Sequence, residues 1–219
     1  MKKNGKFIML YVVVCCLLMA FIEIVIEPSY IIKSLIKIGL FFGIPFIIMR
    51  LLKIRIIDNF KINKNEFIKL LKIGVVVFLI GVVCYLVLRN FFDFSKLTKS
   101  LLVDQNVSKG QFIFVTLYIS FGNSLLEEFF FRLVSFIKFK EYTSKRIAYI
   151  FSSFMFSIYH AAMIGMSFPL PLTILSLIGL FILGIGFDYL DEKDNNIYNS
   201  WFVHMFCDFV IMLVGFLHL

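Results

Sequence analysis

Six ionisable residues lie deep inside apolar stretches of the chain, three of them in one segment and the others in two segments farther along. They are Glu127, Glu128, Arg132, His160, His204 and Asp208. A carboxylate and two imidazoles on separate helices could activate a water molecule, bind a metal ion or stabilise an oxyanion. Polar groups at membrane depth are costly to bury, so these residues are functional candidates.

The first segment, SLLEEFFFRLVSF, contains both glutamates and the arginine. Glu128 and Arg132 are four residues apart, so they share a helix face with the acid before the base, which is the favourable order for an ion pair. Glu127 has no basic residue at that spacing along its own helix. We therefore interpret Glu128 and Arg132 as a supporting ion pair, and Glu127 as the carboxylate left for catalysis.

The second and third segments contain the remaining candidates. His204 and Asp208 are four residues apart and share a face with Ser200, so Asp208 could orient the His204 ring or share a ligand with it. We predict one catalytic site whose members are Glu127, His160, His204 and Asp208. In this site Glu127 would take a proton from the attacking water.

The composition shows which elements must position these residues. Of the 219 residues, 61% are hydrophobic and 16% are charged, whereas soluble domains have about 45–50% apolar and about 25% charged residues. A body of this size could not bury so much apolar surface from water, which excludes a soluble fold. The four cysteines lie in apolar runs without a CxxC spacing, which excludes a disulfide-stapled secreted module.

A spanning helix needs about 20 mostly apolar residues. Seven segments meet this requirement: 7–26, 31–52, 73–92, 111–138, 147–164, from Pro171 to Leu190, and 197–219. We predict an all-α fold, a polytopic integral membrane bundle of about seven transmembrane helices. It forms a single membrane domain over residues 1–219, with three spans and a polar loop in 1–110 and the motif-bearing core in 111–219.

The net charge of +8 comes from basic residues between the apolar runs, where they set topology, and this excludes a nucleic-acid partner. The N-terminus and the loops after the second and fourth spans carry most of them. Fewer lie on the opposite side, among them Lys33 and Lys37. The bias predicts a cytoplasmic N-terminus and an external C-terminus. The polar stretch 89–110 is either an external amphipathic segment or a lid.

Missing motifs narrow the chemistry. The sequence has neither the HExxH of zinc proteases nor the GxSxG of serine hydrolases. Residues 184–188 read GIGFD, one residue off the GxGD of intramembrane aspartyl proteases. Since a matching YD is absent, we interpret Gly184 and Gly186 as helix-packing residues.

Three motifs occur in order: Glu127-Glu128-x-x-x-Arg132, Phe156-x-x-x-His160 and His204-x-x-x-Asp208. This ordered set resembles the CPBP family, which comprises CAAX prenyl proteases of the type II kind and the bacteriocin-processing or immunity proteins also called the Abi family. The resemblance covers the C-terminal half, from the fourth span to the seventh.

The resemblance implies an intramembrane endopeptidase in which Glu127 activates water and His160 and His204 are the motif histidines. The last motif position is commonly Asn in the family and is Asp208 here. Two imidazoles and two carboxylates could hold a divalent metal such as zinc, with Glu127, His160, His204 and Asp208 as its ligands. A metal-free mechanism, in which Glu127 and His160 activate the water, also remains open.

The expected partners are the lipid bilayer and a membrane-associated or leader-bearing peptide. The Lys-, Ile-, Phe- and Asn-rich composition is typical of an AT-rich bacterial genome, which predicts a bacterial plasma membrane. Two alternatives remain open: a non-catalytic scaffold or bacteriocin-immunity protein of the same fold, and a proton- or metal-coupled transporter. Such transporters usually have repeated halves, and no repeat is evident here. The sequence predicts neither the cleavage site nor the oligomeric state.

Overall fold

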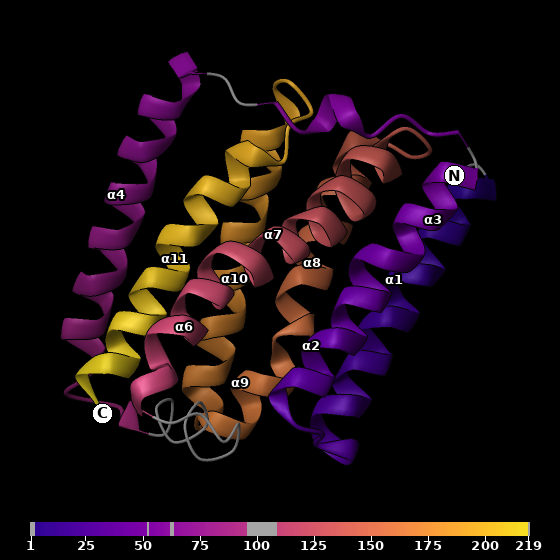
Figure 1. Cartoon of the computed structure of the whole chain (residues 1–219). Helices are drawn as coiled ribbons and strands as arrows, with labels where there is room; N and C mark the ends of the chain where they lie inside the picture. The colour runs from indigo at the N-terminus through magenta and orange to yellow at the C-terminus, as the bar shows by residue number, and fades with distance from the viewer. Residues whose placement is uncertain (1–2, 52, 62–63, 96–108, 219) are drawn as a thin grey trace. The chain divides into compact units, whose positions relative to one another are not determined.

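The computed structural model describes residues 3–51, 53–61, 64–95 and 109–218 (Figure 1). Every regular element in these ranges is a helix, which confirms the predicted all-α class. Most of the polar stretch 89–110, for which a lid was considered, lies outside the described residues.

Six helices among the described residues are long and apolar enough to cross a bilayer. They are Lys3–Ile26, Tyr30–Leu51, Glu66–Leu88, Lys145–Gly165, Leu170–Glu192 and Tyr198–Leu217. The predicted span 111–138 is built instead from consecutive shorter helices. These are η5 (Lys109–Gln111), α6 (Phe112–Leu117), η6 (Tyr118–Asn123), α7 (Ser124–Glu127) and η7 (Glu128–Lys138). The helix inventory agrees with the predicted membrane bundle.

The first two spans contain π-helical turns. Helix α1 (Lys3–Phe21) continues into the π-helical η1 (Ile22–Ile26). The second span is divided into α2 (Tyr30–Ile38), the π-helical η2 (Gly39–Gly43) and α3 (Ile44–Leu51). Pro45 lies in the first turn of α3, where its missing N–H cannot continue the hydrogen-bond ladder of the preceding turn. The interruption at η2 therefore has a local cause.

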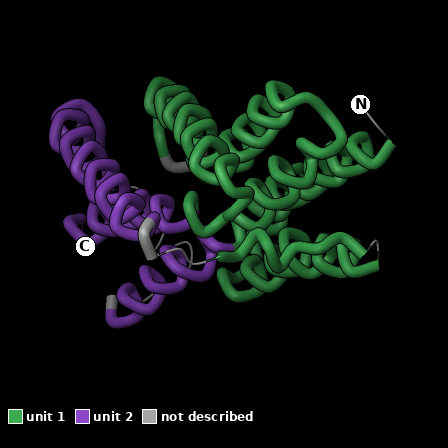
Figure 2. The backbone as a smooth tube through the Cα atoms, turned by 90° about the horizontal axis from the view of Figure 1, so that it is seen from above, with its two compact units in different colours: residues 1–61, 126–200 green, residues 62–125, 201–219 purple. Residues whose placement is uncertain are grey.

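The chain forms two compact units, coloured separately in Figure 2. Unit 1 comprises residues 1–61 and 126–200, and unit 2 comprises 62–125 and 201–219. The predicted division at residue 110 follows motif content rather than packing, and it stays a prediction.

The centre of unit 1 is the π-helical η7, all of whose residues from Glu128 to Lys138 are buried. It contacts α1, η2, α8 (Lys145–Tyr159) and α10 (Leu170–Glu192), and α8 packs along α10. The short helix α9 (Ala161–Ser167) contacts both α8 and α10. The segment that contains the EExxxR motif is therefore enclosed by other helices.

Aromatic rings and one glycine hold these helices together. Phe41 stacks on Phe130 with 3.9 Å between ring centroids, which joins η2 to η7. A Cβ atom at Gly184 would lie 3.0 Å from Ser153 Cα, so the glycine permits the close approach of α10 to α8. At Gly186 a Cβ would meet nothing within 4 Å. The helix-packing interpretation therefore holds for Gly184 and is wrong for Gly186.

Unit 2 contains α4 (Lys64–Leu88), the helices from η5 to η6, and α11 (Tyr198–Leu217) from Trp201 onward. A Cβ at Gly81 on α4 would lie 2.8 Å from Val210 Cγ2 on α11, so these two helices pack closely. Trp201 Nε1 donates a hydrogen bond to Ser124 Oγ at 3.1 Å, which ties α11 to the end of the η6 segment.

Candidate active site

The Glu127 carboxylate lies between two nitrogen-bearing side chains of unit 1. Glu127 ends α7 and precedes η7, and its side chain is buried. Lys37 Nζ lies 2.6 Å from Glu127 Oε1. His160 Nε2 lies 3.6 Å from the other oxygen, Oε2. The two oxygens of one carboxylate therefore face different partners, which come from α2 and from the end of α8.

Lys37 was not expected at this site. The sequence interpretation left Glu127 without a basic partner and counted Lys37 as an external flanking residue. The structure corrects this: Lys37 is buried and forms an ion pair with Glu127 across a sequence separation of 90 residues. Helical spacing reports only partners on the same helix, so it could not reveal this pair. The one available signal was a lysine within an apolar segment.

The conformation of His160 fixes the role of its ring. The residue caps α8 with φ −77° and ψ −11°, at the break before α9. Its Nδ1 lies 2.7 Å from the Phe156 carbonyl oxygen. A carbonyl only accepts hydrogen bonds, so Nδ1 carries a proton. When the ring is neutral, Nε2 is an acceptor that faces Glu127.

Glu128 and Arg132 belong to a second buried group. Arg132 Nε lies 3.1 Å from Glu128 Oε2, and both side chains are fully buried. Arg132 Nη1 also donates to Ser152 Oγ at 3.0 Å and to Asp188 Oδ1 at 3.3 Å. The Phe156 ring lies 4.5 Å from the guanidinium carbon. The arginine thus joins η7, α8 and α10.

Asp188 and Asp191 of α10 extend this group, and sequence reasoning missed both. Ser200 Oγ lies 2.5 Å from Glu128 Oε2 and 2.7 Å from Asp191 Oδ2. The Ser200 hydroxyl therefore lies between the carboxyl groups of η7 and α10 and links these two helices. The spacing of three between Asp188 and Asp191 on an apolar helix was the available signal.

His204 and Asp208 lie one turn apart on α11 in unit 2. His204 Nε2 is 3.8 Å from Asp208 Oδ1, and both side chains are buried. The structure thus brings Glu127 and His160 together in unit 1, and His204 and Asp208 together in unit 2. The convergence of all four residues on one site stays a prediction.

The donor atoms of each unit can be tested against a metal ion. Within the described residues, no three His, Cys, Asp or Glu side chains gather closely enough to hold one. Unit 1 offers one carboxylate and one imidazole at Glu127, whereas catalytic zinc takes three protein ligands. The Lys37 ammonium already places a positive charge next to Glu127 Oε1. A metal held jointly by Glu127, His160, His204 and Asp208 stays a hypothesis.

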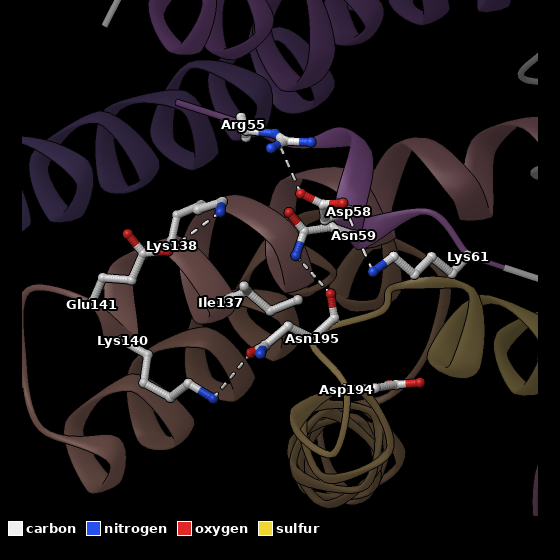
Figure 3. Close-up of a pocket in the computed structure, with 10 residues that line it drawn as sticks. All are labelled: Arg55, Asp58, Asn59, Lys61, Ile137, Lys138, Lys140, Glu141, Asp194 and Asn195. Carbon is white, nitrogen blue, oxygen red and sulfur yellow. Dashed lines mark hydrogen bonds and ion pairs between the residues drawn. The ribbon is translucent and has the colours of Figure 1, made fainter. Parts of the chain in front are cut away.

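A polar pocket of about 550 Å³ lies elsewhere on unit 1 (Figure 3). Its lining consists of Arg55, Asp58, Asn59, Lys61, Ile137, Lys138, Lys140, Glu141, Asp194 and Asn195. Asn59 Nδ2 donates to the Asn195 carbonyl oxygen at 2.6 Å, which joins the loop after the second span to the loop after the sixth. None of the predicted catalytic residues lines this pocket. It brings together three loops that the charge pattern assigns to one side.

Comparison with known proteins gives one match. Residues 109–210 match the family model described as type II CAAX prenyl endopeptidase Rce1-like. No curated protein and no solved structure matches the chain. The matched region contains all three motifs, from Glu127 to Asp208, and this confirms the predicted family resemblance.

Proposed function

We propose, from the match of residues 109–210 to the Rce1-like family of type II CAAX prenyl endopeptidases, that this protein is an intramembrane endopeptidase. Its proposed general base is Glu127. The observation that best supports this role is that Glu127 Oε2 and His160 Nε2 face each other at a distance of 3.6 Å. Both atoms are proton acceptors when the carboxylate is ionised and the imidazole is neutral.

Two adjacent acceptors suit the orientation of a water molecule. Such a water would direct its two hydrogens to Glu127 and His160, which leaves an oxygen lone pair for the scissile carbonyl carbon. As the new C–O bond forms, Glu127 takes the proton of the water. It then gives this proton to the leaving nitrogen as the C–N bond breaks, so the carboxylate is regenerated.

In this proposal His204 and Asp208 stabilise the negative charge that develops on the substrate carbonyl oxygen. An imidazole N–H of His204 would donate to the oxyanion of the tetrahedral intermediate, and Asp208 would hold the His204 ring. Their 3.8 Å separation on one face of α11 supports such a pairing. A divalent metal shared by the four residues would supply the same charge stabilisation by Lewis-acid chemistry.

We propose a membrane-associated or leader-bearing peptide as the substrate, because the base lies among apolar helices that a membrane-embedded chain could approach. The proposed location is a bacterial plasma membrane with a cytoplasmic N-terminus. In that setting a leader-bearing peptide is the better candidate than a prenylated protein. The matched family is described as CAAX prenyl endopeptidases, so a prenylated peptide is included in the test.

Cleavage by purified protein in liposomes tests the proposal. The probes are internally quenched peptides with hydrophobic leaders and an S-farnesylated peptide ending in a CAAX sequence. We expect Glu127→Gln and His160→Ala to lower kcat by about 10²-fold or more, because general acid–base catalysis contributes about 10²–10⁴-fold. His218→Ala is the matched control, since His218 bonds to Tyr85 at 3.0 Å in unit 2 and lies outside the motifs. Normal cleavage by both site variants would rule out Glu127 as the base.

A further inference from the structure

We propose that Lys37 is a positioning residue for Glu127: its contact with one carboxylate oxygen keeps the other oxygen turned toward His160. This inference rests on the proposed function, and it adds a residue of the second span to a site that the motifs place in the C-terminal half. The family match begins at residue 109, so Lys37 lies outside it.

The geometry around Glu127 supports the positioning role. Lys37 contacts Oε1 at 2.6 Å, and His160 faces Oε2 at 3.6 Å. A carboxylate without a fixed partner can rotate about its terminal bond and exchange the two oxygens. The short contact with the ammonium prevents this rotation, so Oε2 stays turned toward the imidazole. The pair that is proposed to orient water therefore depends on the third side chain.

The burial of the pair strengthens this contact. The side chains of Lys37 and Glu127 are 8% and 4% exposed. Buried charges are costly unless they are paired, so the two groups gain by staying in contact. The carboxylate is therefore held by the ammonium in one orientation.

The surroundings of Lys37 hold its ammonium in place. Lys37 Nζ lies 5.0 Å from the centre of the Tyr159 ring and 5.5 Å from that of Phe41, within the range of cation–π attraction. Tyr159 also lies edge-on to the ring of the next residue, His160, at 5.0 Å. Phe41 stacks on Phe130 of η7. One aromatic cluster therefore positions both partners of Glu127.

The same helix provides a matched control. Lys33 lies one turn before Lys37 on α2 and forms an ion pair with Glu23 at 2.9 Å. Its partner belongs to η1 and is a different carboxylate from Glu127. Lys33→Met therefore removes a similar charge and a similar ion pair from α2 without touching the proposed base.

The kinetic test uses the internally quenched peptide that the wild-type protein cleaves. We expect Lys37→Met to lower kcat by about 10²-fold, the low end of the contribution of a general base, with KM within about two-fold. Lys37→Arg restores the charge with a different shape, so we expect it to recover kcat to within about ten-fold of wild type. Lys33→Met should cleave at the wild-type rate. A wild-type kcat in Lys37→Met would overturn the inference.

A second variant covers the case in which Lys37→Met fails to fold. Lys37→Gln is neutral but still polar, and we expect the same fall in kcat with KM within about two-fold. Thermal unfolding in detergent checks that each variant is folded. A wild-type kcat in Lys37→Gln contradicts the inference.

The variants separate the inference from the proposed function. Cleavage by Glu127→Gln at the wild-type rate would overturn both the function and the role of Lys37. An inactive Glu127→Gln beside a fully active Lys37→Met would leave the endopeptidase in place and reject only Lys37. Loss of kcat in both, with recovery in Lys37→Arg, supports both.

Discussion

At the scale of single residues, two glutamates that are adjacent in the chain have different surroundings. Glu127 contacts Lys37 on α2 and faces His160 at the end of α8. Glu128 contacts Arg132 on its own helix and the Ser200 hydroxyl. Adjacent helical residues point about 100° apart, so each carboxylate enters a separate polar group. One group is suited to chemistry and the other to holding helices together.

Replacing Arg132 tests the holding role. Arg132→Met would leave Glu128 and Asp188 without their shared cation in a fully buried position. Breaking a buried ion pair costs about 3–5 kcal/mol, so we expect a marked fall in thermal stability in detergent. Arg55→Met is the control, because Arg55 pairs with Asp58 at the surface with 80% of its side chain exposed. Exposed pairs contribute about 0–1 kcal/mol, so equal losses in both variants would contradict the role.

At the scale of elements, the site lies where regular α-helix gives way to other geometry. Glu127 immediately precedes the π-helical η7, and Lys37 lies in the last turn of α2, two residues before the π-helical η2 begins. His160 occupies the break between α8 and α9. π-Helical turns are uncommon and frequently occur at functional sites. Each of the three side chains that meet at Glu127 therefore lies at or beside a break in regular α-helix.

Two glycines of α10 give a stability test with an internal control. A methyl group at Gly184 would press on Ser153 of α8, whose hydroxyl donates to Asp188 at 3.2 Å. We expect Gly184→Ala to destabilise the protein by about 1–3 kcal/mol, the usual cost of overpacking. Gly186→Ala enters open space, so the helix propensity of Ala should leave stability unchanged or raise it by up to about 1 kcal/mol. Thermal unfolding of the two variants measures the difference. If both variants unfold at the wild-type temperature, the close packing of α10 on α8 is not as described.

At the scale of the whole molecule, charged side chains lie both in a pocket between loops and inside the helices of unit 1. The polar pocket collects residues from the loops after the second, fourth and sixth spans. Three basic side chains of unit 1 are buried, Lys37, Arg132 and Lys138. Each of them faces at least one carboxylate. Basic side chains removed from water are thus neutralised by acidic partners.

Metal removal concerns the whole molecule, because the four proposed metal ligands are divided between the two units. We expect cleavage to stay within about two-fold of wild type after treatment with a strong chelator, with metal loss checked by elemental analysis. The reason is that the Lys37 ammonium already supplies a positive charge beside Glu127. Activity that disappears with the metal and returns with added zinc would instead support a metal held by Glu127, His160, His204 and Asp208.

The sequence by itself determined the class of the protein and its candidate residues. Apolar runs long enough for a bilayer predicted the helical membrane fold, because a helix satisfies all its backbone hydrogen bonds within one apolar segment. The rarity of charge in such runs made Glu127, Arg132 and His160 conspicuous. The spacing of four between Glu128 and Arg132 and between His204 and Asp208 described neighbours on one helix, where 3.6 residues per turn fixes geometry.

Only the tertiary structure decided which helices meet. Lys37 and Asp188 were visible in the sequence as charges in apolar segments, yet nothing in their own helices pointed to Glu127 and Arg132. The packing of η7 among its neighbours brought these partners together. The physical reason is that spacing along a helix specifies contacts over one or two turns. Contacts between helices depend on close packing of all their side chains at once, such as Phe41 on Phe130.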